Sequence, residues 1–292
     1  MILVTGATGT IGRLLVQQLL AAQAEFAALS RDEARGRTLT CPIRACPIRV
    51  GDFDDPESLI RAMEGVTHLF LNSAAGERLA VQQIAALRAA SRQGVSCIVK
   101  ISGWGAATAS DRPLNGWHAQ VEAEMQTLGF RWASLRPNYF MQNLLWSAGR
   151  VRGERRIVSA FGGARLGLID CEDIAACAAT LLVADRPPLG PFALTGPESL
   201  SFDEIAARFS RVLGCRVEFI AQPIEVLVDA MRRRGVSEFL STSFAQMMRA
   251  FAAGEADQVS PDAEKILGRP PRTLDQFLHT HRAEFSTPEG TS

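Results

Sequence analysis

The sequence feature that most constrains the fold is a set of three evenly spaced glycines within the first dozen residues. The segment Met1-Ile-Leu-Val-Thr-Gly6-Ala-Thr-Gly9-Thr-Ile-Gly12 places them between a short apolar run and an amphipathic stretch. This order predicts a strand, a tight turn and a helix, in which Gly6 forms the turn and Gly12 lets the helix pack closely on the strand. We therefore expect a Rossmann βαβ unit here.

The predicted turn also has the character of a phosphate-binding loop. A helix N-terminus presents free N–H groups and a partial positive charge, and both favour an anionic group. Gly9 would let the backbone approach the pyrophosphate of a dinucleotide. The residues of this loop that we expect to bind NAD(P) are Gly6, Thr8, Gly9, Thr10, Ile11 and Gly12.

Short apolar runs alternate with helical patterns as far as Pro137. The runs predict strands at residues 2–5, 26–30, 48–50, 68–72, 97–101 and 131–136. The intervening patterns predict helices at residues 11–22, 55–63, 77–93 and 117–128. Alternation of this kind indicates an α/β protein with a doubly wound parallel sheet covered by helices on both faces.

After Pro137 the pattern loosens. Strands are still expected at 166–169 and 192–194, with a helix between them that ends at Val183, and Ser201 with Glu204 forms a capping-box pattern at the start of another helix. We predict a Rossmann domain over 1–195, a smaller, mainly helical substrate lobe over 196–285, and a frayed tail over 286–292. Residues 145–165 are a candidate contribution to the substrate lobe.

Aromatic and methionine residues recur at helical spacing in the predicted lobe. They are Phe239, Phe244, Met247, Met248 and Phe251. Two interpretations stay open, because such residues either pack a core or line a substrate pocket.

Composition narrows the classes of partner. Lysine plus arginine and aspartate plus glutamate both number 31, and no run of like charge exceeds Arg232–Arg234, so we expect no nucleic-acid partner. No apolar stretch is long enough to span a membrane, and we expect a cytoplasmic protein, either a monomer or a homodimer, with a small-molecule substrate. The six cysteines form no CxxC pair, so we expect reduced thiols and no metal site.

The residues after the second predicted strand indicate which nucleotide is bound. An acidic side chain at this position would favour NAD, but the chain has Ser30-Arg31, and a guanidinium suits the 2′-phosphate of NADP. We expect NADP(H) to be preferred, with Arg35 as a second contact, while Asp32 keeps NAD(H) possible. Further expected contacts to the cofactor are Asp52 and Phe53 at the adenine, and Asn72, Ser73 and Ala74 along its path.

Dehydrogenases of the short-chain type commonly use a Tyr-x-x-x-Lys pair, in which the lysine lowers the pKa of the tyrosine so that the phenol acts as an acid. This chain lacks the pair. Its one tyrosine, Tyr139, is followed four residues later by Asn143, and its two lysines are Lys100 and Lys265. Proton donation must come from another group.

Several segments resemble the NmrA-like group of atypical short-chain dehydrogenases. They are the GxxGxxG loop, Trp117-His118-Ala-Gln-Val-Glu122, Leu135-Arg-Pro-Asn-Tyr-Phe-Met-Gln-Asn143, Leu194-Thr-Gly-Pro-Glu198 and Leu267-Gly-Arg-Pro-Pro271. The likeness runs almost from end to end. It implies a Rossmann fold and a function like those of the group, which includes quinone reductases, triphenylmethane dye reductases and redox-sensing regulators.

The resemblance also implies roles for particular residues. The group often carries a lysine or histidine that faces the nicotinamide at the start of a helix, and His118 matches that position; the alternative is a histidine that only caps or packs. Ser102 matches a serine that bonds a substrate carbonyl, or is only a turn residue. Pro137, Asn138 and Tyr139 would lie along the nicotinamide.

Three functions are consistent with this sequence. The first is an NADPH-dependent reductase that passes hydride to a quinone, a conjugated carbonyl or a dye-like molecule, with His118 and Ser102 as catalytic residues. The second is a redox sensor that binds NAD(P) without turnover. The third is an isomerase or cyclase of a biosynthetic pathway, for which no residue pattern argues directly.

Overall fold

The fold is that of a computed structural model, which describes residues 1–32, 34, 46–106 and 112–286. Arg35 and the tail from residue 287 therefore lie outside the described residues. The chain divides into two compact units. One comprises Met1–Pro137 and Cys171–Ala193, and the other Asn138–Asp170 and Leu194–Ser292. The assignment of substrate binding to the second unit stays a prediction.

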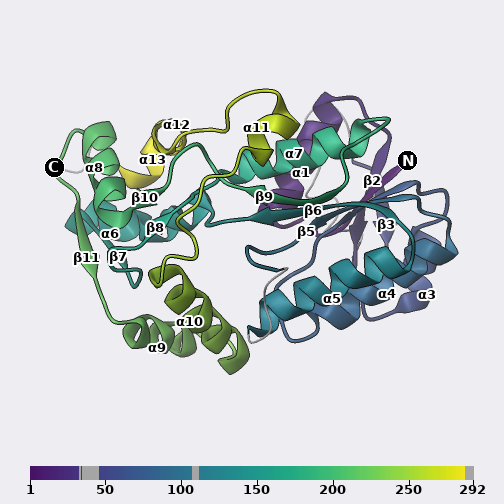
Figure 1. Ribbon diagram of the computed structural model, residues 1–292, viewed down its shortest axis with the longest axis horizontal. Coiled ribbons are helices and arrows are strands. Elements are labelled where there is room, and N and C mark those ends of the chain that lie inside the picture. The colour runs from purple at the N-terminus through teal and green to yellow at the C-terminus, as the bar shows by residue number, and fades with distance from the viewer. Residues whose placement is uncertain (33, 35–45, 107–111, 287–292) are drawn as a thin grey trace. The chain divides into compact units, whose positions relative to one another are not determined.

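The first unit is built on a seven-stranded sheet with the order β3-β2-β1-β4-β5-β6-β9 (Figure 1). The strands are β1 (Ile2–Val4), β2 (Phe26–Ser30), β3 (Ile48–Val50), β4 (His68–Leu71), β5 (Cys97–Ile101), β6 (Arg131–Pro137) and β9 (Gly190–Leu194). From β3 to β6 every neighbouring pair is parallel. The doubly wound parallel sheet predicted from the sequence is confirmed.

Strand order reverses between β1 and β4, and a doubly wound sheet binds its ligands outside the carboxyl ends of the strands at such a switch point. The residues that directly follow β1, β4 and β5 are therefore brought to one edge of the sheet. That edge is the place to look for a functional site.

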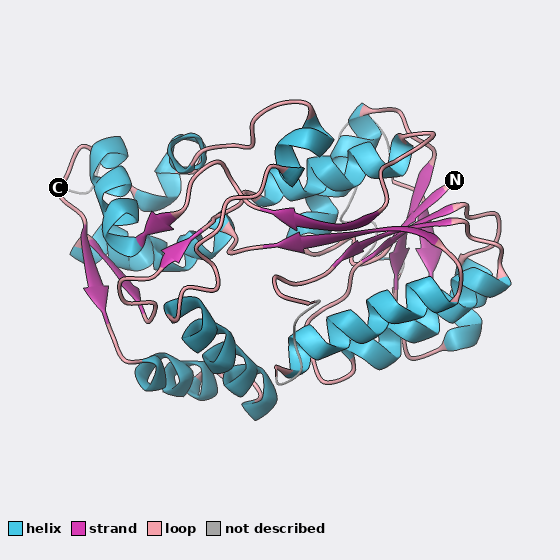
Figure 2. Cartoon of the chain, in the orientation of Figure 1, coloured by secondary structure: helices cyan, strands magenta, loops and turns pink. Residues whose placement is uncertain are grey.

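Helices cover both faces of this sheet (Figure 2). On one face lie α1 (Thr10–Ala21) and α7 (Cys171–Val183), and on the other α3 (Pro56–Ala62), α4 (Leu79–Arg92) and α5 (Pro113–Thr127). The strands between these layers are apolar on both faces, as a sheet covered on both sides requires. Leu3, Leu69 and Ile98 are completely buried in the core.

Local signals explain where the helices begin. Asp55 caps α3 by accepting from the backbone N–H of Ser58, with Pro56 in the first turn. A proline also occupies the first turn of α5, which begins at Pro113 rather than near residue 117 as predicted. His118 therefore lies in the second turn of the helix and not at its start.

The second unit contains two small sheets and most of the remaining helices. In one sheet β7 (Arg156–Ser159) pairs in parallel with β11 (Glu218–Ala221), and in the other β8 (Arg165–Leu166) pairs antiparallel with β10 (Leu200–Ser201). Its helices are η2 (Met141–Ser147), α6 (Ala148–Glu154), α8 (Phe202–Leu213), α9 (Ile224–Arg233), α10 (Glu238–Ala252), α11 (Asp262–Leu267), α12 (Leu274–Thr280) and α13 (Arg282–Phe285).

Two expectations for this region need correction. The strand predicted at 166–169 is found only at Arg165–Leu166, because the N–H of Gly167 donates instead to Ala256 O at 3.0 Å. The pairing of β7 with β11 was not predicted, since it joins segments far apart in sequence that lack a clear alternating pattern.

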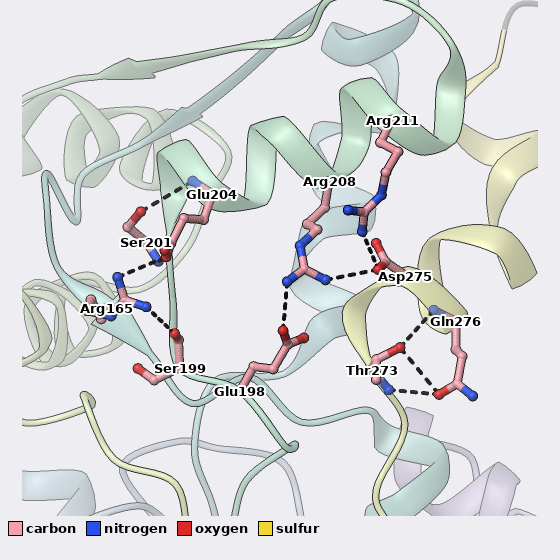
Figure 3. A network of polar contacts seen from close by, with 10 residues as sticks. All are labelled: Arg165, Glu198, Ser199, Ser201, Glu204, Arg208, Arg211, Thr273, Asp275 and Gln276. Carbon is pink, nitrogen blue, oxygen red and sulfur yellow. Dashed lines mark hydrogen bonds and ion pairs between the residues drawn. The ribbon is translucent and has the colours of Figure 1, made fainter.

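A polar network holds part of the second unit together (Figure 3). Arg208 of α8 donates to Glu198 at 2.7 Å and to Asp275 of α12 at 2.9 Å. The predicted capping box is present, with Ser201 accepting from the N–H of Glu204 and Glu204 accepting from the N–H of Ser201. The contact of Arg208 with Asp275 links α8 to α12, and the capping box stabilises the start of α8.

An aromatic cluster fills the interior of the same unit. Phe161 lies edge-on to Tyr139, with 5.3 Å between ring centroids, and stacks on Phe202 and Phe251. Met248 and Phe251 of α10 are buried, so these two side chains pack a core. Among the described helices none is both long and apolar enough to cross a membrane.

Candidate functional site

The loop after β1 has the conformation that its glycines predict. Gly6 has a φ of +62°, and a Cβ atom there would lie 2.8 Å from the carbonyl oxygen of Asn72. At Gly12 a Cβ atom would lie 2.2 Å from the carbonyl oxygen of Gly6, so a side chain cannot be accommodated without displacing the backbone. The turn is closed by a hydrogen bond from the N–H of Gly9 to Gly6 O at 3.0 Å.

The first turn of α1 is open to an anion. Its N-cap is Gly9, which has no side chain to accept from the free N–H groups, and no acidic residue lies in the first turn. Gly9 and Thr10 are exposed, Thr8 is half-buried, and Ile11 is buried beneath them. Uncapped N–H groups at an exposed helix start suit a phosphate, and these residues therefore fit the pyrophosphate of a dinucleotide.

A pocket of about 420 Å³ lies beside the ends of β2 and β3. It is lined by Arg31, Val50, Gly51, Asp52, Asp55, Ser58 and Arg61. The carboxylate of Asp32 accepts a hydrogen bond from the N–H of Ala34 at 2.7 Å. One oxygen of the acidic side chain that would favour NAD is therefore already occupied by the backbone. Arg61 was not among the predicted residues, because its position inside α3 carries no motif.

The segment after β4 lies against the glycine loop. The N–H of Asn72 donates to Thr5 Oγ1 at 2.8 Å, and Gln83 of α4 donates to Ser73 Oγ at 2.9 Å. Ala74 is exposed. Phe53, after β3, is partly buried against the core.

A buried lysine and a histidine meet at the carboxyl end of β5. Lys100 is completely buried in the strand, and its Nζ donates to the carbonyl oxygen of Ile101 at 2.8 Å. The same Nζ lies 2.8 Å from Nδ1 of His118, which α5 brings alongside. This Lys100–His118 pair was not predicted, since the two residues are 18 apart and belong to different elements.

Burial governs the charges of the pair. Desolvation lowers the pKa of Lys100 to about 7, with Glu122 opposing the shift and Arg136 reinforcing it. Desolvation and the charge of Lys100 hold the pKa of His118 well below its usual value. The imidazole of His118 is therefore uncharged at neutral pH, whereas an unperturbed histidine titrates close to neutrality.

Glu122, one turn beyond His118, forms hydrogen bonds with three further side chains. Its Oε1 accepts from Ser102 Oγ at 2.7 Å, Ser134 Oγ at 2.5 Å and Arg136 Nε at 3.1 Å, and its Oε2 pairs with the guanidinium of Arg136. Burial alone would raise the pKa of Glu122, but these hydrogen bonds and the arginine charge lower it overall. The carboxylate is thus ionised, and we call these four residues the Glu122 cluster.

The Glu122 cluster changes what Ser102 can do. An ionised carboxylate only accepts, so the single hydroxyl hydrogen of Ser102 points to Glu122. Ser102 is 5% exposed, and its lone pairs remain able to accept a hydrogen bond. A role in donating to a substrate carbonyl, which stays a prediction, would require this hydroxyl to turn away from Glu122.

The loop after β6 is held by hydrogen bonds. Pro137 ends the strand, and the buried side chain of Asn138 donates to Ala256 O at 3.0 Å and accepts from the N–H of Tyr139 at 2.7 Å. Burial raises the pKa of Tyr139, which makes its phenol a poor acid at neutral pH. Contacts of this loop with a nicotinamide stay a prediction.

These features define a class of protein. An open glycine loop at the switch point of a doubly wound sheet is the arrangement of a dinucleotide-binding Rossmann protein. The chain belongs to the NmrA-like family, whose model matches residues 1–278. The resemblance inferred from the sequence motifs is confirmed.

Among curated relatives, the NAD(P)H azoreductase of Xenophilus azovorans is 33% identical over 289 residues, which are 98% of this chain and 99% of that protein. A structure of the NADPH-dependent quinone oxidoreductase of Escherichia coli with NADPH superposes with a TM-score of 0.86 at 24% identity, over 97% of this chain and 100% of that one. The triphenylmethane reductase of Citrobacter sp. with NADP(H) gives a TM-score of 0.81 at 27% identity, over 94% and 97%.

Proposed function

We propose that the protein is an NADPH-dependent reductase that passes hydride to a small electron-poor acceptor such as a quinone, an azo compound, a conjugated carbonyl or a dye. One observation carries this proposal. The phosphate-binding loop follows β1, and the buried Lys100–His118 pair lies at the carboxyl end of β5, which is separated from β1 by β4 in the same sheet. A dinucleotide and a proton donor are thereby supplied at one place.

The relatives support the same class. The azoreductase is named for its use of NAD(P)H and aligns with the chain over nearly its whole length. An NAD(P)H-dependent oxidoreductase was expected from the sequence, and this expectation is confirmed. The triphenylmethane reductase and the quinone oxidoreductase act on other electron-poor molecules, which is why we name a class of acceptor and no single compound.

The bound cofactor would supply the hydride, and the protein residues would provide binding and proton transfer. The free N–H groups of Thr10 and Ile11 at the start of α1 bind the pyrophosphate, and Arg31 binds the 2′-phosphate of the adenosine. In this proposal His118, whose Nδ1 lies 2.8 Å from Lys100 Nζ beside the carboxyl end of β5, protonates the acceptor. The missing Tyr-x-x-x-Lys pair is thus no obstacle to reduction.

The proposed preference for NADP(H) over NAD(H) rests on the charges around the pocket beside the ends of β2 and β3, which would hold the adenosine. Arg31 and Arg61 both line it, while the carboxylate of Asp32 is engaged by a backbone N–H. The contacts at Asp52, Phe53, Asn72, Ser73 and Ala74 belong to the same proposal. Arg35 lies outside the described residues.

We further propose that the protein works in the cytoplasm as a monomer or a homodimer. Cys46, Cys97 and Cys215 are free thiols, and a reducing compartment keeps thiols in this form. Sedimentation with and without NADPH would decide the oligomeric state.

The test is a set of NADPH oxidation assays with quinones, azo compounds, enones and cationic dyes, paired with calorimetric titration of NADPH and NADH. We expect turnover with at least one class and tighter binding of NADPH. Binding of NADPH without oxidation by any acceptor would favour the redox sensor. Conversion of a compound without net oxidation of NADPH would favour an isomerase or cyclase.

A further inference from the structure

We propose that Lys100 and His118 form a two-step proton relay, in which Lys100 fixes the tautomer of His118 and replaces the proton that His118 gives to the reduced acceptor. The proposal rests on the reductase function and deepens it. It also predicts which acceptors need the relay and which do not.

The tautomer follows from the hydrogen bonds of the lysine. An ammonium group only donates, and Lys100 Nζ donates to Ile101 O at 2.8 Å while lying 2.8 Å from His118 Nδ1. While Lys100 carries its proton, Nδ1 of His118 must therefore accept, and in a neutral imidazole the hydrogen is then on Nε2. His118 is held neutral by burial and by the charge of Lys100, so Nε2–H is its only acidic position.

The Nε2 side of the ring faces a glycine. A Cβ atom at Gly103 would lie 3.1 Å from His118 Cδ2 and 3.6 Å from Nε2, so any side chain at position 103 would crowd the ring. Gly103 follows Ser102 at the carboxyl end of β5, the edge at which a doubly wound sheet binds ligands. The absence of a side chain leaves room beside the donor atom.

The proton balance of the relay is simple. An azo group or an enone that has received hydride from NADPH carries a negative charge on nitrogen or oxygen. The Nε2–H bond of His118 breaks as a proton passes to that atom, and Nδ1 accepts a proton from the Lys100 ammonium. Lys100 becomes a neutral amine, and after product release water returns one proton to Nε2 while the Nδ1 proton goes back to Nζ.

The surroundings of Lys100 allow it to exchange a proton near neutral pH. Glu122 from α5 raises its pKa, Arg136 from β6 lowers it, and burial lowers it most. His118 is a further titratable group in contact with it. A lysine in water holds its proton too firmly for this task, whereas a donor with a pKa near the working pH transfers it efficiently.

Acceptor charge provides the sharpest test. A cationic triphenylmethane dye becomes a neutral product by taking up hydride alone, so its reduction needs no proton. Lys100→Met, which keeps much of the side-chain volume, should lower kcat with an azo acceptor by about a hundredfold and leave kcat with the cationic dye within about twofold. Lys265→Met, which removes the exposed second lysine, should change neither.

Two further readouts separate the relay from a structural role. The azo reaction should show a solvent deuterium isotope effect that the dye reaction lacks. The ¹⁵N resonances of His118 in the cofactor-free protein should show hydrogen on Nε2 and none on Nδ1, and this assignment should be lost in Lys100→Met. Lys100→Arg, which keeps a donor but does not release its proton, should retain the tautomer without restoring the azo rate.

The outcomes are distinct. Equal loss of azo and dye reduction in Lys100→Met, or a hydrogen on Nδ1 of the wild-type histidine, would overturn the relay. If no acceptor oxidises NADPH, the reductase function fails, and the ¹⁵N resonances alone decide whether Lys100 sets the tautomer of His118.

Discussion

The glycine loop and the Lys100–His118 pair lie at the same edge of the sheet but are built from different material. The loop binds through backbone N–H groups, and its glycines matter because they have no side chain. The pair is made of two side chains that burial and mutual charge have moved away from their ordinary pKa values. The proposed cofactor binding thus depends on glycines that lack side chains, and the proposed proton transfer depends on two side chains that are shielded from water.

The largest effect should come from the buried lysine itself. In the unfolded chain Lys100 titrates near 10.5, and in the fold near 7, so between these values the unfolded state holds the extra proton. The free energy of unfolding of the wild type, relative to Lys100→Met, should therefore rise by about 1.4 kcal/mol per pH unit over this window. Below pH 7 this difference should be flat.

Urea denaturation at several pH values between 6 and 10 measures this difference, and the groups common to both proteins cancel. Lys265→Met should show no such slope, because that side chain is exposed. A flat difference for Lys100→Met would mean that the lysine keeps its ordinary pKa in the fold.

The next largest effect should come from breaking the Glu122 cluster. Glu122→Gln removes the charge that pairs with Arg136 in a mostly buried place, and we expect a loss of about 3 kcal/mol in the free energy of unfolding. Glu124→Gln is the matched control, since its partner Arg88 is largely exposed, and it should cost less than about 1 kcal/mol. Urea denaturation at pH 7 compares the two variants. Equal losses of the free energy of unfolding would contradict a larger stabilising contribution from the Glu122 cluster.

The glycine loop can be tested by adding one carbon atom. Gly12→Ala places a Cβ against Gly6 O, and we expect a loss of about 2 kcal/mol in stability together with weaker NADPH binding. Gly149→Ala, inside α6 with open space around it, should instead stabilise the protein by roughly 0.5 kcal/mol. Thermal unfolding and calorimetric titration give both quantities, and unchanged NADPH affinity in Gly12→Ala would contradict the proposed loop.

The smallest effect concerns the choice of cofactor. Arg31→Ala should raise the Kd for NADPH about tenfold, or about 1.4 kcal/mol, because a charge-assisted contact to the 2′-phosphate is lost. The Kd for NADH should not change, and neither should that of NADPH in Arg92→Ala, which removes an exposed arginine of α4. Equal weakening for both cofactors would place Arg31 on the adenine or ribose rather than on the phosphate.

The sequence by itself determined the sheet and the loop, because both depend on local patterns. Apolar runs of strand length give β1 to β6 nearly residue by residue, and the spacing of Gly6, Gly9 and Gly12 requires a turn that only glycine tolerates. It also singled out His118 and Ser102 through family resemblance, without showing what either side chain contacts.

Only the tertiary structure decided the chemistry of the site. In the sequence, Lys100 is a single lysine within an apolar strand and belongs to no motif. It pairs with His118 only because β5 and α5 bring the two side chains together. Glu122 takes the hydrogen of Ser102, and Arg61 joins Arg31 across a pocket formed by α3 and β3. A pKa and a hydrogen-bond partner are properties of surroundings, and the surroundings of these residues come from segments far apart in the chain.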